Sequence, residues 1–366
     1  MTLRRSIRLA IAGLGNCASA LLQGIDYYKH RDPATPGLLY HRVGEYTVDS
    51  IVPAACFDID KRKVGKRLSE AAFQAPNCAA RFQKELTDWD VSVQMAPVLD
   101  GVSGHMSSFP PACAFRVSDS RPVNVAQTLR EKEIDVLVCY MPVGSQHAVE
   151  HFSQACLDAG VAMVNCVPVF IASDVKWAEK FGAAGIPIIG DDIKSQFGAT
   201  IVHRTLVRLL EERGVALQRT YQLNTGGNTD FLNMLERARL ATKKLSKTEA
   251  VQSQLNTPLD DENIHIGPSD YVAWQQDNKV AFLRLECEGF GGTPLSLEMR
   301  LSVEDSPNSA GVVIDAIRAA KLASDRKQGG PLEPACAFFM KHPPNQMPDV
   351  EAHAALDAWI ASEALA

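Results

Sequence analysis

Several features that would place this chain in a special class are absent from it. No apolar run is long enough to span a membrane. Basic residues are not in excess, since 37 lysines and arginines stand against 43 aspartates and glutamates. The sequence therefore gives no general field for nucleic acid or an anionic membrane. With no repeat or low-complexity tract, 46% hydrophobic residues and 366 residues in all, it predicts a soluble globular protein of two domains.

The cysteines argue against a disulfide framework. They are nine, an odd number, and no two form a Cys-x-x-Cys pair. Reduced thiols in a cytoplasmic protein fit this pattern best, and no His/Cys spacing builds a dedicated metal site. The basic residues before the first apolar run could indicate a signal peptide, but Gly13, Gly15 and Asn16 interrupt that run, so we expect a first strand instead.

That first strand, residues 7–12, leads into the sequence Gly13-Leu14-Gly15-Asn16-Cys17-Ala18. A Gly-x-Gly-x-x-Ala turn between a strand and a helix is typical of dinucleotide binding: one glycine permits the turn, one admits the pyrophosphate, and the small alanine lets the helix pack closely. A tight turn that binds nothing is the other interpretation. The motif alone does not decide between them.

Further apolar runs predict strands at 51–57, 135–140, 162–166 and 186–189, with a crossover helix at 146–160. Continuous apolar strands are typical of a parallel sheet covered on both faces. Pro187 cannot donate to a sheet ladder, so we expect it at the start of its strand or on an edge. Asp58 follows the second strand, where a ribose hydroxyl would be held, although a surface turn residue is the alternative.

Near residue 200 the pattern changes from continuous to alternating. A helix with one apolar face is expected over 202–210, and an antiparallel hairpin over 280–288 and 295–303. Such a sheet is half-exposed or covered by another subunit. A helix is expected from Ser309 to Asp325, whereas 31–48 and 101–122 are expected to be loops.

Four segments in the second half carry polar and charged residues in patterns too specific for packing alone: residues 224–231, 243–247, 277–279 and 339–344. Together with residues 15–19 and 191–196, they resemble the myo-inositol phosphate synthases, above all the compact actinobacterial type. The resemblance runs from about Ile7 to Pro348 and includes 168–174, 231–237, 265–270 and 305–311.

The resemblance implies an α/β fold, with a Rossmann-type doubly wound parallel sheet and a second, α+β domain whose sheet is mainly antiparallel. It implies an NAD-binding domain over 1–199, to which 305–366 return, and a catalytic and tetramerisation domain over 200–304 of a homo-tetramer. The implied reaction cyclises glucose 6-phosphate. NAD takes hydride from carbon 5, an enolate at carbon 6 attacks the carbon 1 aldehyde, and NADH reduces the ketone. Clustered lysines suit this reaction because enolate and alkoxide charges require fixed cations.

By the resemblance, the catalytic residues are Lys243, Lys279, Lys341, Lys247, Lys194, Asp192 and Asp305. We expect Lys243 to transfer the proton at the oxidised hydroxyl, and Lys279 and Lys341 to polarise the acceptor carbonyl. The implied cofactor-binding residues are Gly13, Gly15, Asn16, Cys17, Ala18, Asp58, Tyr140, Pro142, Pro168, Asp192 and Ser306. The implied substrate-binding residues are Ser195, Gln196, Asn228, Thr229 and Asp230. A weakly bound cation at Asp191, Asp192 and the phosphate is a further possibility.

The chain departs from the actinobacterial pattern at a few positions. Thr225 stands where valine is expected, Thr229 where methionine is, Cys166-Val167 where Ala-Leu is, and His342 where serine is. Drift is one interpretation, and a changed substrate is the other. With the acceptor carbonyl at carbon 2, as in fructose 6-phosphate, the same chemistry would close a five-membered cyclitol phosphate for specialised metabolism. A plain NAD-dependent dehydrogenase and a silent nucleotide-binding protein are the rival classes.

Overall fold

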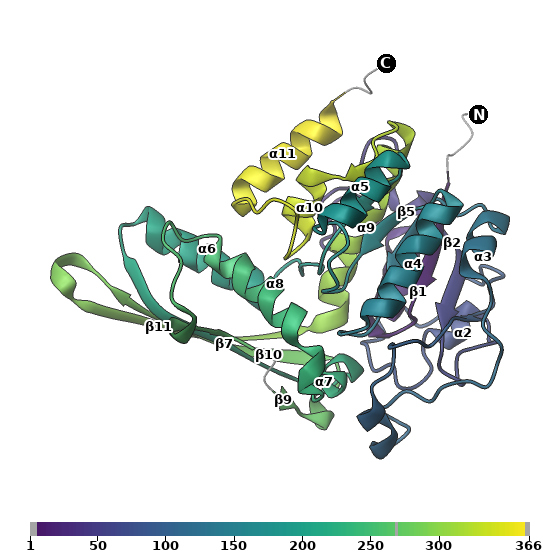
Figure 1. Ribbon diagram of the computed structural model, residues 1–366, viewed down its shortest axis with the longest axis horizontal. Coiled ribbons are helices and arrows are strands. Elements are labelled where there is room, and N and C mark those ends of the chain that lie inside the picture. Colours follow the sequence, from purple (N-terminus) through teal and green to yellow (C-terminus); the bar gives the residue numbers. More distant parts are fainter. Residues whose placement is uncertain (1–5, 268–269, 363–366) are drawn as a thin grey trace.

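The computed structural model describes residues 6–267 and 270–362, which form two sheets with helices packed on them (Figure 1). The first sheet is parallel throughout, in the order β12-β6-β5-β4-β1-β2-β3. Its strands are β1 (Ile7–Ala12), β2 (Ile51–Asp58), β3 (Gln94–Met95), β4 (Val136–Cys139), β5 (Ala162–Asn165), β6 (Pro187–Ile189) and β12 (Gly330–Pro331). Pro187 is the first residue of its strand, as its missing N–H requires.

Helices cover both faces of this sheet, which confirms the doubly wound prediction. One face packs against α1 (Asn16–Tyr28) and α9 (Asp305–Asp325), and these two helices also contact each other. The other face is covered by α3 (Val125–Glu131), α4 (Gln146–Ala159) and α5 (Val175–Ala183). The central strands β4 and β5 are fully buried between these layers, as their largely apolar sequence predicts.

The second sheet is mixed, with the order β11-β10-β7-β8 and β9 paired to β7. Its long strands β7 (Ala216–Gly226), β10 (Asn278–Glu288) and β11 (Pro294–Glu304) are antiparallel, whereas β8 (Ile264–Ile266) and β9 (Asp270–Tyr271) run parallel to β7. Helices α6 (Ala199–Glu212) and α8 (Ala241–Gln252) pack on one face. The opposite face is open, since Leu223 and Phe282 are 37% and 42% exposed.

The C-terminal part returns to the first sheet. Helix α9 begins at Asp305, four residues before the predicted start. Pro307 does not prevent this, since it stands in the first turn, where a missing N–H breaks no intrahelical bond. Beyond it, α10 (Glu333–Phe339) and α11 (Asp349–Ala361) pack together. The remaining helices are the short α2 (Leu68–Ala71) and α7 (Thr229–Asn233). Among the described residues, no helix is long and apolar enough to cross a membrane.

Candidate active site

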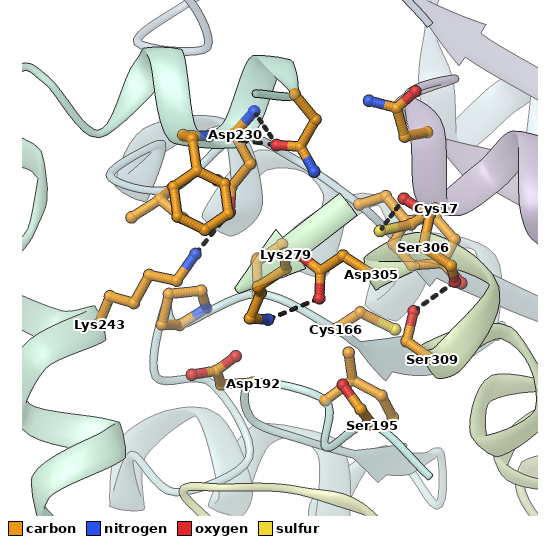
Figure 2. A pocket seen from close by; sticks show the side chains of 18 of the residues that line it. Cys17, Cys166, Asp192, Ser195, Asp230, Lys243, Lys279, Asp305, Ser306 and Ser309 are labelled. Atoms are coloured by element: carbon orange, nitrogen blue, oxygen red, sulfur yellow. Dashed lines mark hydrogen bonds and ion pairs between the residues drawn. The ribbon is translucent and has the colours of Figure 1, made fainter. Parts of the chain in front are cut away.

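A cavity lies where the carboxyl ends of β1, β4, β5 and β6 face the second sheet. The chain order reverses between β1 and β4, which is where ligands bind in open α/β sheets. The cavity is lined by segments from both ends of the chain, from Gly15 to Lys341. Figure 2 shows the polar side chains that point into it.

The glycine turn forms one wall. Gly13 has φ +94°, and a Cβ there would lie 2.7 Å from the Tyr140 carbonyl oxygen, so only glycine fits. At Gly15 no atom lies within 4 Å of the Cβ position, which leaves the backbone open to a ligand. Helix α1 begins after Gly15 with no side-chain cap, so its first N–H groups remain free to bind an anion. Ala18 is fully buried and lets α1 lie close to the sheet.

Polar residues around this turn hold its shape. The Leu14 N–H donates to Asp58 Oδ2 at 2.7 Å, and Lys63 Nζ donates to the Leu14 carbonyl at 2.6 Å. Asp58 therefore braces the turn and does not line the cavity, and its expected ribose contact stays a prediction. Asn16 and Cys17 do line it.

These residues fit a dinucleotide. The buried Tyr140 hydroxyl lines the cavity and has no hydrogen-bond partner within residues 6–267 and 270–362, so it is available to a ligand. Pro142 and Pro168 line the cavity at the ends of β4 and β5. Ser306, which also lines the cavity, accepts a hydrogen bond from Cys17 Sγ at 3.8 Å.

Three lysine–carboxylate pairs converge on the cavity. Lys243 Nζ on α8 is 2.6 Å from Asp230 Oδ2, and Lys279 Nζ on β10 is 2.5 Å from Asp305 Oδ1 (Figure 2). Lys341 Nζ donates to Asp192 Oδ1 at 2.8 Å and to the Ile193 carbonyl at 2.6 Å. The structure thus brings together residues that are far apart in the sequence.

These pairs set the charge states. Burial raises the pKa of Asp192, but Lys341 and Lys243 outweigh it, so the net pKa is lowered. Burial also opposes ionisation of Asp305, and Lys279 and Lys243 again bring its pKa below the ordinary value. For Lys243, burial lowers the pKa, but Asp230 and Asp192 raise it further, and the net shift is upward. Lys243 is therefore held as an ammonium.

Lys247 lies one turn further along α8 and differs from the other three. It is 6% exposed and lines the cavity, and no described carboxylate lies within ion-pair distance of its Nζ. Burial, followed by the charges of Lys243, Lys279 and Lys341, lowers its pKa well below the ordinary value. Burial and the surrounding ammonium groups therefore favour the neutral amine of Lys247 over its charged form.

The expected substrate residues divide into two groups. Ser195, Asn228, Thr229 and Asp230 line the cavity. Beside Ser195, the N-terminus of α6 also faces it, with no side-chain cap at Gly198. The Gln196 side chain does not line the cavity, because its Nε2 donates to the Gly37 carbonyl at 2.6 Å.

Lys194 also lies outside the cavity, although Ile193 and Ser195 line it. Its Nζ donates to the Ala337 carbonyl at 2.9 Å and to Asp349 Oδ1 at 3.0 Å, so a direct catalytic role is not supported by its position. Asp191 is turned away as well, since its carboxylate accepts from Asn165 and from the 171–173 backbone. No cluster of metal-ligating side chains occurs in the part of the chain that is described.

Sequence reasoning missed the part played by Asp277. Its carboxylate accepts from Asn228 Nδ2 at 3.0 Å and from Ser306 Oγ at 2.9 Å, and so joins two cavity residues. Burial, followed by the nearby charge of Asp305, raises its pKa to about 7. The signal was its place two residues before Lys279. Of the positions that depart from the actinobacterial pattern, Thr229, Cys166 and Val167 line the cavity, whereas Thr225 and His342 do not.

Comparisons with known proteins agree with this geometry. Residues 198–306 match the family model described as myo-inositol-1-phosphate synthase. The chain is 54% identical over 360 residues to the inositol-3-phosphate synthase of Mycolicibacterium smegmatis, covering 97% of this chain and 98% of that protein. It is 51% identical to the protein of the same name from Corynebacterium glutamicum, with the same coverage.

Solved structures show the same fold. The crystal structure of a protein called Ari2 superposes with a TM-score of 0.76 at 35% identity and covers 98% of this chain and all of that chain. A myo-inositol-1-phosphate synthase-related protein from Thermotoga maritima superposes with a TM-score of 0.77 at 22% identity, covering 98% and 99% of the two chains. The near-complete match to these relatives agrees with the glycine turn and the three lysine–carboxylate pairs of the cavity. The chain therefore belongs to the inositol-3-phosphate synthase family of isomerase-type enzymes.

Proposed function

We propose that this protein cyclises glucose 6-phosphate to an inositol phosphate by the redox-neutral sequence of oxidation, enolisation, aldol closure and reduction. The observation that carries the proposal is the cavity itself, in which three lysines paired with carboxylates and a fourth, buried lysine without such a partner surround a space next to a dinucleotide turn. Oxidation at one carbon and charge stabilisation at another both require such an arrangement.

The Gly13–Gly15 turn, the N-terminus of α1 and Tyr140 would hold NAD. When bound, NAD would supply reversible hydride transfer at carbon 5. Cys17 and Ser306 close that side of the cavity between the two domains.

The substrate phosphate suits the end of the cavity at Ser195 and α6. The uncapped N–H groups at the start of α6 and the partial positive charge of the helix N-terminus attract an anion. Asn228 and Asp230, which line the cavity at α7, would bind sugar hydroxyls. The substrate would thus lie across the lysines.

The two kinds of lysine then have different tasks. Lys247, whose neutral form is favoured by burial and by the neighbouring lysines, accepts the proton released when the hydroxyl is oxidised, a role that the resemblance suggested for its neighbour Lys243. Lys243, kept charged by Asp230, supplies a proton or a fixed positive charge. Lys279 and Lys341, each on a carboxylate, stabilise the enolate and alkoxide oxygens.

We further propose that the chain acts as a homo-tetramer. The open face of the second sheet exposes Leu223 and Phe282 in the middle of long strands, and Leu295 and Leu297 are 46% and 37% exposed on the edge strand β11. Apolar surface of this kind marks protein interfaces. Analytical ultracentrifugation tests the tetramer, and a monomer at micromolar concentration would exclude it.

The deciding experiment incubates the protein and NAD separately with glucose 6-phosphate and with fructose 6-phosphate. Periodate-sensitive cyclitol phosphate from glucose 6-phosphate without accumulation of NADH is the expected result. Stoichiometric NADH without cyclisation would instead indicate a plain dehydrogenase. A cyclitol phosphate from fructose 6-phosphate alone would support the second candidate, the five-membered ring, which is favoured only by the presence of Thr229, Cys166 and Val167 in the cavity wall.

A further inference from the structure

Lys194 is a buried cation that the proposed reaction does not use. Its side chain is 2% exposed and is turned away from the cavity, between two residues that line it. The Nζ atom donates to the carbonyl of Ala337, near the end of α10, and to the carboxylate of Asp349, the first residue of α11. Lys194 thus binds both ends of the segment 337–349, which joins the two helices.

That segment is also paired with the loop on which Lys194 lies. The Lys194 N–H donates to the Phe339 carbonyl at 2.8 Å, and the Lys341 N–H donates to the Asp192 carbonyl at 2.7 Å. His342 and Asp191 exchange two backbone hydrogen bonds, each of 3.0 Å. This short ladder places the Lys341 ammonium on the Asp192 carboxylate.

A second buried cation holds the same carboxylate. The Arg204 side chain, fully buried on α6, has its Nε 2.9 Å from Asp349 Oδ2, and its Nη2 donates to the Met347 carbonyl at 2.7 Å. The N-terminus of α6 faces the cavity. Asp349 therefore ties the 337–349 segment to two elements of the cavity wall, through Lys194 and through Arg204.

Asp349 is the shared acidic partner of Lys194 and Arg204. Two buried cations share one carboxylate, and neither has another described acidic partner within ion-pair distance. Burial, followed by the charge of Arg204, lowers the pKa of Lys194 to about 7, and Asp349 acts in the opposite direction. Removing one member of a buried ion pair leaves an uncompensated charge, which displaces the groups around it.

We propose that Lys194 is a positioning residue which, with Asp349 and Arg204, holds the 337–349 segment against the 190–194 loop and so fixes the Lys341 ammonium in the cavity. The inference rests on the proposed function, because it assigns Lys194 an effect on cyclisation through Lys341. Misplacing a catalytic group by about 1 Å costs on the order of 100-fold in rate, so a side chain outside the cavity can still control the reaction.

The test compares Lys194→Met, Lys341→Ala and the double variant. Lys194→Met is expected to lower kcat for cyclitol phosphate about 10- to 100-fold, while the Kd for NAD changes less than about twofold. Because Lys194 acts through Lys341, the double variant should be no slower than Lys341→Ala alone, within about threefold. If the two losses multiply, or if Lys194→Met retains full kcat, the positioning role is wrong.

A second readout does not depend on activity. Hydrogen exchange of the peptide that covers 339–346 should be at least about tenfold faster in Lys194→Met, since its N–H groups bond to the 190–194 loop, whereas peptides from β4 should be unchanged. If the wild type makes no cyclitol phosphate, the proposed function fails, and this exchange measurement still decides whether Lys194 holds the segment. Unchanged exchange overturns the inference.

Two further variants complete the design. Asp349→Ala removes the same contact from a side chain that is 26% exposed, and so provides the test if Lys194→Met does not fold. Its kcat and exchange should change in the same direction. Lys321→Met is the matched control. Lys321 on α9 is also an ion-paired lysine, bound to Asp135 and Asp325, and it lies away from the cavity. It should change kcat and the exchange of 339–346 by less than about twofold. An equal effect in Lys321→Met would show a general loss of stability and overturn the inference.

Discussion

Asp277 holds Ser306 by two hydrogen bonds, one from the Ser306 N–H to Oδ2 at 3.1 Å and one from its Oγ to Oδ1 at 2.9 Å. Asp277 precedes β10 of the second sheet, and Ser306 lies in the first turn of α9, which packs on the first sheet. The contact therefore joins the two halves of the cavity. Its carboxylate is buried, and the pKa is raised to about 7, first by burial and then by Asp305.

This raised pKa predicts a specific pH dependence of stability. In the folded state the pKa of Asp277 is about 7, whereas in the unfolded chain the carboxyl has its ordinary pKa of 3.8. Between these values the folded state holds more protons, so this group favours folding as the pH falls from about 8 to about 5. Asp277→Asn removes the contribution, and its stability relative to wild type should be higher at pH 8 than at pH 5. Urea unfolding at both pH values measures the free energy of unfolding of each protein. The same difference between variant and wild type at pH 8 and at pH 5 would contradict the prediction.

Lys247 is expected to be essential for chemistry and dispensable for cofactor binding. Lys247→Met keeps the length and burial of the side chain but removes the amine, so kcat should fall by about 100- to 10,000-fold. The Kd for NAD, followed by fluorescence, should change less than about twofold. Lys244→Met is the matched control, since Lys244 lies on the same helix and is exposed. Equal activity in the two variants would remove Lys247 from the mechanism.

The two glycines of the turn should respond differently to substitution. Gly15→Val places a side chain where no atom lies within 4 Å, so the protein should fold normally, with NAD affinity reduced at least about tenfold because the pyrophosphate approach is filled. Gly13→Ala, with positive φ and a contact of 2.7 Å to a carbonyl oxygen, should instead lose about 1–3 kcal/mol of stability. Thermal melts with and without NAD separate the two effects. A stable Gly13→Ala variant would show that the turn has a different conformation.

Thr229 and Thr225 offer a test of substrate choice. Both replace apolar residues of the actinobacterial pattern, but only Thr229 lines the cavity. Thr229→Met should change kcat/KM for the preferred sugar phosphate by about 10-fold or more, because it removes a hydroxyl and adds volume at the substrate. Thr225→Val should leave kcat/KM within about twofold. An unchanged kcat/KM in Thr229→Met would mean that Thr229 does not contact the sugar.

The sequence predicts the strands β1, β2, β4, β5 and β6 of the first sheet because their signals are local, whereas the two-residue strands β3 and β12 are not predicted. Unbroken apolar runs between loops specify buried parallel strands, and the glycine turn specifies its own backbone shape. Element ends were less predictable. Helix α9, for example, begins at Asp305 and not at the predicted Ser309, and Pro307 is tolerated because it stands in the first turn.

The site was predictable in its members and less so in their orientation. The resemblance identifies the four lysines that line the cavity. It also includes Lys194 among the catalytic residues, but only its neighbours Ile193 and Ser195 line the cavity, and the Lys194 side chain points away from it. In an extended segment successive side chains alternate, and no local signal says which face is which. Asp277 was not assigned because its effect arises from contacts with Asn228 and Ser306, which lie far from it in sequence.

The packing of α1 on α9 has a consequence for synthesis of the protein. At ~5–20 residues per second, a ribosome needs on the order of ten seconds to a minute to make the chain between these helices. During that time the apolar face of α1 and one face of the first strands lack their permanent cover. This apolar surface of the nascent chain thus stays exposed to solvent until residues 305–325 emerge.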